Sequence, residues 1–381
     1  MKKTPLLGVL ALAGVLALAA CGTDDPAAGQ AKESAPSGEF ASYLETAYKG
    51  QVGAPPTAVS KPKSGVSLWV MSCGEQTTGC SGPASALMEA GKAAGWQTHL
   101  CDGQLNPTGF ASCVRQAVSA KANVFIPVGI DCSTIKQPFQ DARDAGVVVV
   151  GGGGANCQDE NGKDIWATER LQLDGLDLKS YYLLNGKLQA DYLIGKTGGQ
   201  AKVLVLNFTD QVWGPWVTEG FKAELAKCSG CSVVSTLDIS NADWGGNTAV
   251  QKFQAALLAA PTANSVIVPV DGWMTQGLSQ AVMSSGRNDQ LIVIGRFADK
   301  PNLELIRNNQ GQDASVGYAT NWGAWGSVDE AVRVLNGEQP VVEGDGVQVV
   351  DADHNMPPAG QEFSAGVDYK NLYLKAWGLA S

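Results

Sequence analysis

Short apolar runs alternate with helical patterns along most of this chain, and this alternation restricts the fold more than any other feature. Each run is too short for a helix, and several, such as 66–72 and 203–206, are mainly apolar, as in strands that are buried on both faces of a parallel sheet. Helical patterns separate successive runs, so the chain consists of βαβ units. The runs form two successive sets, at 66–72, 98–101, 124–128 and 147–150, and then at 203–206, 232–237, 265–270 and 291–294.

The length of the chain agrees with two lobes. It has 381 residues, whereas a single hydrophobic core stops growing near roughly 250 to 300 residues. Its hydrophobic content of 44% and charged content of 17% are those of an ordinary globular protein. The sequence therefore predicts an α/β protein with two similar lobes, each built on a parallel sheet.

The first residues have the pattern of an export signal. Residues 1–20 begin with two lysines and continue in an apolar run that is too short to span a membrane as a helix. The signal ends in Leu18–Gly22, where small residues precede Cys21. This ending resembles the bacterial lipobox, in which the cysteine becomes the lipidated first residue; ordinary cleavage nearby is the alternative. Residues 23–37 are rich in Ala, Gly, Asp and Ser and are typical of a flexible tether.

The cysteines of an exported chain are expected to form disulfides. Of the nine cysteines, Cys21 is assigned to the lipid and eight remain, which allow 105 pairings on paper. The C-S-G-C motif at 228–231 has an alternative interpretation as a redox pair, but it follows a helix rather than opening one, which favours a structural disulfide. Proximity in the sequence suggests the pairs Cys73 with Cys80, Cys101 with Cys113, Cys132 with Cys157, and Cys228 with Cys231.

The segment 203–222 places aromatic residues where a ligand would bind in such a sheet. It begins with a buried-type strand and ends at the start of an amphipathic helix, and the loop between them carries Asp210, Trp213 and Trp216. In open parallel sheets, the loops that leave the carboxyl ends of the strands form the ligand site. Two indoles and a carboxylate on such a loop predict a small-molecule binding site.

Several short motifs occur in an order that is typical of one family. In the first half of the chain they are Ala93–Trp96, Ile126–Asp131 and Ala142–Val147. In the second half they are Glu219–Phe221, Pro269–Gly272 and Val334–Glu338. Over residues 64–350 the chain resembles a type I periplasmic solute-binding protein of the ribose/galactose-binding kind, the receptor subunit of an ABC importer.

The resemblance implies two Rossmann-like lobes with parallel central sheets, which are joined by three hinge crossovers and trap the ligand between them. The crossovers are expected near 165–173, 318–321 and 350. Closure of the lobes on the ligand would be the motion that matters for transport. On this basis the chain divides into a signal peptide (1–20), a lipidated cysteine with a tether (21–63), an N-terminal lobe (64–170 and 319–349) and a C-terminal lobe (171–318 and 350–381).

Most ligand-binding positions of the family carry other residue types in this chain. In the sugar receptors they hold an acid–arginine pair after the fourth strand, an arginine before the Glu-Gly-Phe motif, an asparagine, an aspartate after the last strand and a hinge glutamine. An aromatic position is kept, as Trp244. The substituted positions hold, in the same order, Gly153 and Gly154, Pro215 or Trp216, Val270, Phe297 and Tyr318.

These substitutions change the ligand that the resemblance implies. A site built to bond hydroxyl groups loses affinity when they are unpaired, whereas an aromatic site gains from buried apolar area. We therefore expect a ligand that is less polar than ribose, with an aromatic or alicyclic body and one or two polar ends; a monosaccharide is the alternative. The candidate contact residues are Glu75, Gln76, Trp213, Trp216, Trp244, Asp271, Trp273, Arg296, Tyr318 and Trp322.

Some of these candidates also have a purely structural interpretation. Asp271 and Arg296 could pair with each other or cap helices. Trp69 lies within a predicted strand and Trp377 on the last helix, so both are expected in the core, and Trp325 fits the core of its own helix.

An enzyme is the first rival interpretation. The glycine run 151–154 follows a buried strand, as in dinucleotide-binding loops, but the sixth position of the G-x-G-x-x-G pattern falls on Asn156 or Cys157. The sequence has neither a P-loop nor G-x-S-x-G, and its two histidines, His99 and His354, are far apart. We therefore expect no catalysis, no metal and no cofactor.

A transcriptional repressor and a sensor are the other rivals. A repressor with this fold would need a basic N-terminal DNA-binding motif, but a signal sequence stands there and the net charge is −10. No nucleic-acid partner is therefore expected. A sensor would pass ligand occupancy to a membrane receptor, and the sequence does not separate it from an importer subunit. The expected partners are a small-molecule ligand, ABC permease subunits and the outer face of the cell membrane through Cys21, with the protein itself a monomer.

Overall fold

The computed structural model describes residues 38–380. The predicted signal peptide, Cys21 and the residues 23–37 predicted to be flexible lie outside this range. None of the helices within it is both long and apolar enough to cross a membrane.

The first lobe is built on a parallel sheet of four strands in the order β2-β1-β3-β4. The inner strand β3 is completely buried, as its apolar sequence predicts. The strands are β1 (Ser67–Ser72), β2 (Gln97–Asp102), β3 (Val124–Pro127) and β4 (Val148–Val149), and the connecting helices are α2 (Thr78–Ala93), α3 (Pro107–Ser119), η1 (Cys132–Ile135) and α4 (Lys136–Asp144).

The second lobe holds a sheet of six strands in the order β10-β9-β8-β7-β5-β6. All neighbours are parallel except β9 and β10, which are antiparallel. The strands are β5 (Lys202–Phe208), β6 (Ser232–Ile239), β7 (Ser265–Ile267), β8 (Ile292–Phe297), β9 (Ala314–Tyr318) and β10 (Val347–Asp351). The helical elements are α5 (Leu178–Lys196), α6 (Trp213–Leu225), α7 (Asn241–Gly245), α8 (Ala249–Ala259), η2 (Met274–Leu278), α9 (Ser279–Ser284), η3 (Asn288–Gln290) and α10 (Lys300–Arg307).

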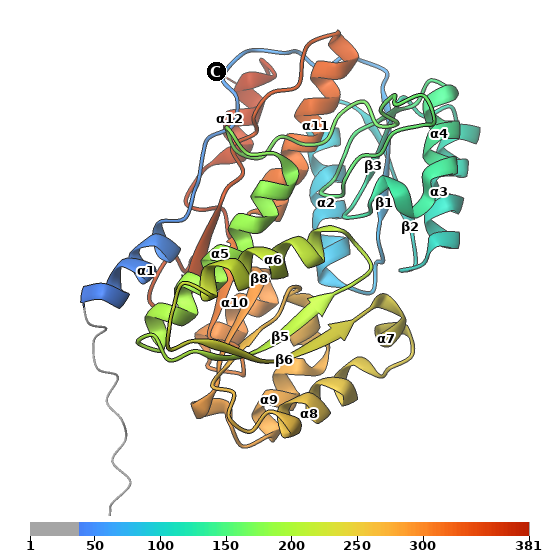
Figure 1. The fold of residues 1–381 in the computed structure, drawn as a ribbon. Helices are drawn as coiled ribbons and strands as arrows, with labels where there is room; N and C mark the ends of the chain where they lie inside the picture. Colours follow the sequence, from blue (N-terminus) through green and yellow to red (C-terminus); the bar gives the residue numbers. More distant parts are fainter. Residues whose placement is uncertain (1–37, 381) are drawn as a thin grey trace, which may run out of the picture. The chain divides into compact units, whose positions relative to one another are not determined.

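The chain passes from lobe to lobe in several places (Figure 1). After β4, residues 150–177 lead to α5 of the second lobe, and after β9 the chain enters α11 (Thr320–Asn336), which packs against α2 of the first lobe. It returns before β10, through residues 337–346. The first two passages lie where they were expected, whereas the third precedes 350, because β10 belongs entirely to the second sheet.

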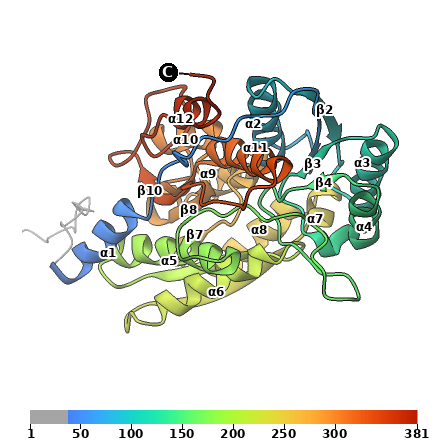
Figure 2. The same cartoon turned by 90° about the horizontal axis from the view of Figure 1, so that it is seen from above.

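Two terminal elements pack differently from the predicted division of the chain. Helix α12 (Tyr369–Ala376) was assigned to the second lobe with 350–381, but Tyr373 and Trp377 stack with Trp325 of α11, so α12 packs on the first lobe. Helix α1 (Gly38–Lys49) was assigned to the tether, but it packs along α5 of the second lobe, where Ala47 is completely buried (Figure 2). Both helices carry apolar faces that find a partner in the fold.

Within the described residues, four disulfides cross-link loops and helices of the lobes. They join Cys73 to Cys80, Cys101 to Cys113, Cys132 to Cys157, and Cys228 to Cys231. These are the pairs that proximity in the sequence suggests. Three of them lie in the first lobe, and Cys73–Cys80 fastens the loop after β1 to the first turn of α2.

Candidate functional site

A cavity lies between the two lobes at the carboxyl ends of their strands. Its volume is ≈ 120 Å³, counted as space open to the centre of a water molecule. One water needs about 10–15 Å³ by this measure, so the cavity has room for a small organic molecule. Its walls come from the loops after β1, β3 and β4 on one side and after β5, β6, β7, β8 and β9 on the other. This is the position that the doubly wound architecture predicts for a ligand.

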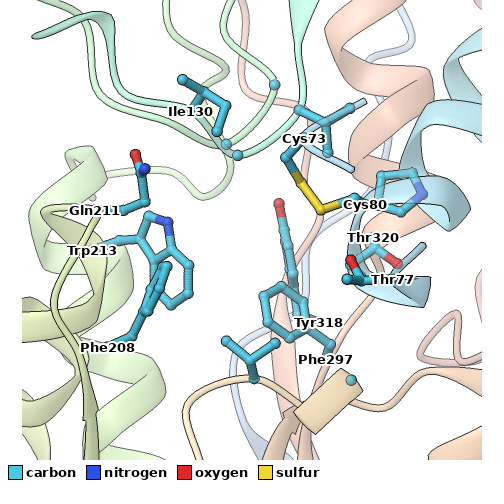
Figure 3. A pocket seen from close by; sticks show the side chains of 18 of the residues that line it. Cys73, Thr77, Cys80, Ile130, Phe208, Gln211, Trp213, Phe297, Tyr318 and Thr320 are labelled. Atoms are coloured by element: carbon cyan, nitrogen blue, oxygen red, sulfur yellow. A yellow bond between two sulfur atoms is a disulfide. The ribbon is translucent and has the colours of Figure 1, made fainter. Parts of the chain in front are cut away.

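Aromatic rings form most of the second-lobe wall. Trp213 lies 5.1 Å from Phe208 between ring centroids, Phe208 lies 5.6 Å from Trp273, and Trp273 lies 5.7 Å from Trp244. Phe297 continues this series, with its ring edge-on to Trp213 at 6.3 Å. Figure 3 shows Trp213 and Phe208 on one side of the cavity and Phe297 and Tyr318 across from them.

Arg296 is a charged group within this aromatic wall. Its side chain is completely buried, and Nε donates to Asn185 Oδ1 at 2.9 Å. The guanidinium carbon lies 4.2 Å from the ring centre of Phe297, 4.8 Å from that of Trp213 and 5.0 Å from that of Tyr182. Burial lowers the pKa of Arg296 from its ordinary value, while the ring faces favour the cation. Its Nη1 and Nη2 atoms have no hydrogen-bond partner among residues 38–380.

A second arginine of the lining, Arg170, is neutralised within the protein. It forms an ion pair with Asp345 at 3.2 Å, and both side chains are buried. Its Nη1 donates to the Gly323 carbonyl at 3.0 Å and its Nη2 to the Tyr318 hydroxyl. Because Arg170 lies in the first crossover and Gly323 on α11, these bonds join two segments that connect the lobes.

The first-lobe wall is small and apolar. It includes Val128, Ile130, Gly152, Gly153 and the Cys73–Cys80 disulfide, and Figure 3 shows this disulfide facing the aromatic side chains. Gly152 lies so close to β3 that an added Cβ would lie 2.3 Å from the Pro127 carbonyl oxygen, so no larger residue fits there. The glycine run therefore allows close packing of the chain, in agreement with its failure to match a nucleotide-binding pattern.

Asp131 connects the two lobes at the edge of the cavity. Its Oδ2 accepts the Val212 amide hydrogen at 2.7 Å, and its backbone N–H donates to Gln211 Oε1 at 2.9 Å. Val212 directly precedes α6, so the carboxylate lies at a helix N-terminus, where the helix dipole favours negative charge. The lobes of this structure are therefore in contact beside the ligand site.

Five of the ten predicted contact residues line the cavity. Trp273 is followed by the wide helical turn η2, where Gly277 has a φ of +127°; such turns are frequent at functional sites. Trp244 is carried by α7, which begins with a capping box formed by Ser240 and Asp243. The five residues are Trp213, Trp244, Trp273, Arg296 and Tyr318.

The other five lie outside the lining. Glu75 is exposed, and Gln76 lies beside it on the loop after β1. Trp216 packs against Tyr182, with 6.3 Å between ring centroids, and is not part of the lining. Trp322 is completely buried and donates from Nε1 to the Glu343 carbonyl at 3.1 Å, so it belongs to the core of α11.

Asp271, the remaining candidate, is a buried scaffold residue. Its carboxylate accepts hydrogen bonds from the backbone N–H groups of Arg296 and Ala298, at 2.9 and 2.8 Å, and from the Gln312 and Ser315 side chains, both at 2.8 Å. Asp271 therefore has structural contacts, but not the predicted ones: its carboxylate bonds to the backbone N–H of Arg296 and does not pair with the guanidinium.

Several lining residues are absent from the predicted set. Tyr182 reaches the cavity from α5, where it donates to the Gly153 carbonyl, and nothing in its helical pattern marks it as a contact. Phe208 and Phe297 end the buried strands β5 and β8, and this position at a strand end is a signal that could have found them. The polar lining residues Gln211, Asn241, Gln276 and Thr320 also come from loops or first helical turns at the strand ends.

The fold and the site define a class of protein: two α/β lobes with a ligand cavity between them, as in the type I binding proteins. The profile of the family described as "periplasmic binding protein domain" matches residues 76–339. This is more than half of the chain, and the chain belongs to this family. No curated protein sequence matches the chain.

Solved structures of similar fold come from several organisms. The 5-methylthioribose transporter solute-binding protein of Thermotoga lettingae, in complex with 5-methylthioribose, has a TM-score of 0.65 at 17% identity, over 83% of this chain and 95% of that chain. An ABC transporter solute-binding protein of Agrobacterium vitis, bound with α-D-tagatopyranose, has a TM-score of 0.64 at 20% identity, over 77% of this chain and 97% of that chain. The periplasmic protein of Actinobacillus succinogenes with bound D-allose has a TM-score of 0.62 at 17% identity, over 77% and 98%.

These comparisons confirm the family and the two-lobed fold that the sequence predicts. Proteins of this family bind solutes outside the cytoplasm and are not enzymes. The chain is therefore a solute-binding protein. Within residues 38–380, no group of three or more His, Cys, Asp or Glu side chains is arranged to hold a metal ion.

Proposed function

We propose that this protein is the lipid-anchored receptor of an ABC importer and that it captures a small, weakly polar molecule between its lobes. The observation that carries the ligand class is the cavity lining. Aromatic side chains dominate one wall, small apolar residues form the other, and no carboxylate or lysine is part of the described lining. The lining also holds polar side chains such as Gln211, Asn241 and Gln276, but it lacks the carboxylates that accept hydrogen bonds from sugar hydroxyl groups, whereas an apolar body gains from the buried area.

The mechanism that we propose is binding by lobe closure, without chemical change of the ligand. The contacts of Asp131 with Gln211 and Val212 show which surfaces meet when the lobes approach beside the cavity. A closed pair of lobes presents one continuous surface to the permease subunits, and opening releases the ligand to them. We expect the receptor to act as a monomer at the outer face of the cell membrane.

The ligand class is tested by thermal unfolding of residues 36–381, which form one compact unit. One set of solutes contains monosaccharides, and the other contains aromatic, alicyclic and other weakly polar molecules. A ligand at about 100 times its dissociation constant adds roughly 2.7 kcal/mol to the free energy of unfolding, so the midpoint temperature rises by several degrees. A rise with sugars alone would reject the weakly polar ligand and favour the sugars named for the solved neighbours.

Two tryptophans of α6 provide a matched pair for the site. Trp213 lines the cavity, whereas Trp216 lies on the same helix outside the lining. We expect Trp213→Leu to weaken ligand binding about tenfold or more, because the ring contact is lost, and Trp216→Leu to change it little. Calorimetric titration with the ligand found in the screen measures both. Equal affinities of the two variants would show that the cavity is not the ligand site.

The anchor and the destination are tested in cells. If Cys21 carries the lipid, Cys21→Ser releases the protein from the membrane fraction, and an unchanged distribution contradicts the anchor. If the receptor serves an importer, deletion of the neighbouring permease genes abolishes ligand uptake. A strain without such genes, in which the protein pulls down a membrane receptor, would favour the sensor alternative.

A further inference from the structure

One positive charge of the cavity lining has no ion-pair partner among the described residues, although the buried carboxylates of Asp271 and Asp299 lie close enough to interact with it electrostatically. Two charged side chains, Arg170 and Arg296, belong to the lining. Arg170 is paired with Asp345 at 3.2 Å, whereas within residues 38–380 no carboxylate lies at ion-pair distance from Arg296. A buried charge is strongly disfavoured unless another group compensates it. The rings around Arg296 compensate it partly through their faces, while its Nη1 and Nη2 atoms are covered from water and have no hydrogen-bond partner among the described residues.

The unpartnered buried polar atoms of the lining are all hydrogen-bond donors. They are Nη1 and Nη2 of Arg296, Nε of Arg170 and Nε1 of Trp244. Within the described lining, no side-chain oxygen is both buried and without a hydrogen-bond partner. A buried donor without a partner costs about 1–3 kcal/mol. The lining is therefore complementary to a ligand that supplies acceptor oxygens, which distinguishes it from a site for hydroxyl groups that both donate and accept.

The geometry around Arg296 restricts the shape of the acceptor. Phe297, Trp213 and Tyr182 surround the guanidinium, with ring centres 4.2 to 5.0 Å from Cζ, so only a thin group reaches its edge. A carboxylate is planar and matches the two parallel N–H groups of the fork. A phosphate group is thicker and carries more charge, for which the described lining offers no lysine and no second free arginine. The fork thus favours a single carboxylate.

We propose that the ligand is a small monocarboxylic acid with an apolar body the size of one ring. Its carboxylate binds the Nη1 and Nη2 atoms of Arg296, and its body lies against the aromatic wall. The rings now cover both Nη atoms from water, so one ring turns aside when the acid binds. This inference rests on the proposed function, because it names the polar end of the weakly polar ligand.

The experiment compares acids with amides of the same shape. Calorimetric titrations of residues 36–381 use benzoate, phenylacetate and cyclohexanecarboxylate, each beside its uncharged amide. We expect at least one acid to bind, with its amide about 10- to 100-fold weaker, because a hydrogen bond to an ionised acceptor is the stronger one. Amides that bind as tightly as their acids, or acids that all fail to bind at millimolar concentration, would overturn the proposal.

Variants of Arg296 separate the effect of the planar guanidinium from the effect of its positive charge. Arg296→Lys keeps a cation without the planar fork, and Arg296→Met removes the cation; we expect both to lose acid binding about tenfold or more. Arg115→Gln removes an exposed cation from α3 and serves as the control with unchanged affinity. If Arg296→Met does not fold, Arg296→Lys and the acid–amide comparison on the unchanged protein still decide.

The outcomes also separate this inference from the proposed function. Binding of amides or alcohols without preference for acids rejects the carboxylate and leaves a weakly polar ligand in place. Binding of monosaccharides alone rejects both. Full acid affinity in Arg296→Met would place the carboxylate elsewhere in the cavity and remove Arg296 from the site.

Discussion

Replacing Asp271 by alanine tests whether this buried acid supports the cavity wall or contacts the ligand. Its carboxylate accepts four hydrogen bonds, two from backbone N–H groups at the end of β8 and two from the side chains of Gln312 and Ser315. These bonds hold Phe297 and Ala298 at φ angles of +113° and +56°, which are unusual for residues other than glycine. Phe297 lines the cavity, so Asp271 positions a ring of the site without touching the ligand.

The magnitude follows from the donors that alanine would leave unpaired. Ala298 N–H keeps the Ser315 hydroxyl at 3.0 Å, and Gln312 keeps the Ala314 carbonyl at 3.2 Å. The Arg296 N–H and the Ser315 O–H lose their acceptor. Each such donor costs about 1–3 kcal/mol, so we expect a loss of about 3 kcal/mol in the free energy of unfolding. At roughly 2–4 °C per kcal/mol, the second lobe should unfold about 6–12 °C lower.

The assay is thermal or urea unfolding near pH 8. Burial and the nearby Asp299 raise the pKa of Asp271 to about 7, so the carboxyl is mostly ionised there and accepts all four bonds. Ser315→Ala completes a double-mutant cycle, because in the Asp271→Ala background it removes the orphaned O–H donor and also the last acceptor of Ala298 N–H, and these two effects roughly cancel. It should cost less in the Asp271→Ala background than alone, with a coupling of about 1 kcal/mol. An unchanged stability of Asp271→Ala together with a large loss of ligand affinity would refute the scaffold role.

Two further predictions concern the connections between the lobes. Glu330 is completely buried on α11, and burial raises its pKa to about 8. The protonated side chain is favoured in the folded state, so its contribution to the free energy of unfolding is complete below about pH 4.5 and is lost as the pH rises through 8. Glu330→Gln should therefore reduce the decrease in the free energy of unfolding between pH 4.5 and pH 8. Unfolding titrations with equal pH slopes in both proteins would contradict this. Asp131→Ala removes the inter-lobe bond to Val212, and we expect a larger radius of gyration without ligand by X-ray scattering; an identical radius in both proteins would show that this bond does not help to hold the lobes together.

The sequence predicts the inner strands well because they are buried on both faces, whereas the edge strands β2 and β6 are partly exposed and less apolar. Runs such as 203–206 cannot be anything but inner strands, and β5 lies there with slightly wider bounds. The helix α10 was missed because it is short and its charged residues hide its apolar face. The packing of α1 and α12 was also missed. A terminal helix can cover either lobe, and only the final contacts, such as those of Trp377 with Trp325, decide which.

Site residues were predictable where they follow a strand directly. Tyr318 ends β9, and Trp213 follows the loop after β5, so their positions indicate a cleft contact. The choice between neighbours on a helix was not predictable in the same way. Trp213 and Trp216 lie three residues apart, and their different exposure to the cavity depends on how α6 packs against Tyr182 of α5. That packing is a tertiary contact with no signal in the local sequence.

The electrostatic balance of the cavity links the substitutions in the sequence to the choice of ligand. By the family resemblance an aspartate is expected after the last strand, where this chain has Phe297, and no carboxylate of the described residues lies at ion-pair distance from the neighbouring Arg296. A site with an acid beside an arginine suits a ligand that donates hydrogen bonds to the acid. Without the acid, the arginine suits a ligand that carries a negative charge. The aromatic rings exclude water, which strengthens this requirement because charges interact more strongly where the dielectric constant is low. A neutral sugar meets neither condition, whereas an apolar acid meets both, and this is why acid and amide pairs discriminate better than any comparison among sugars.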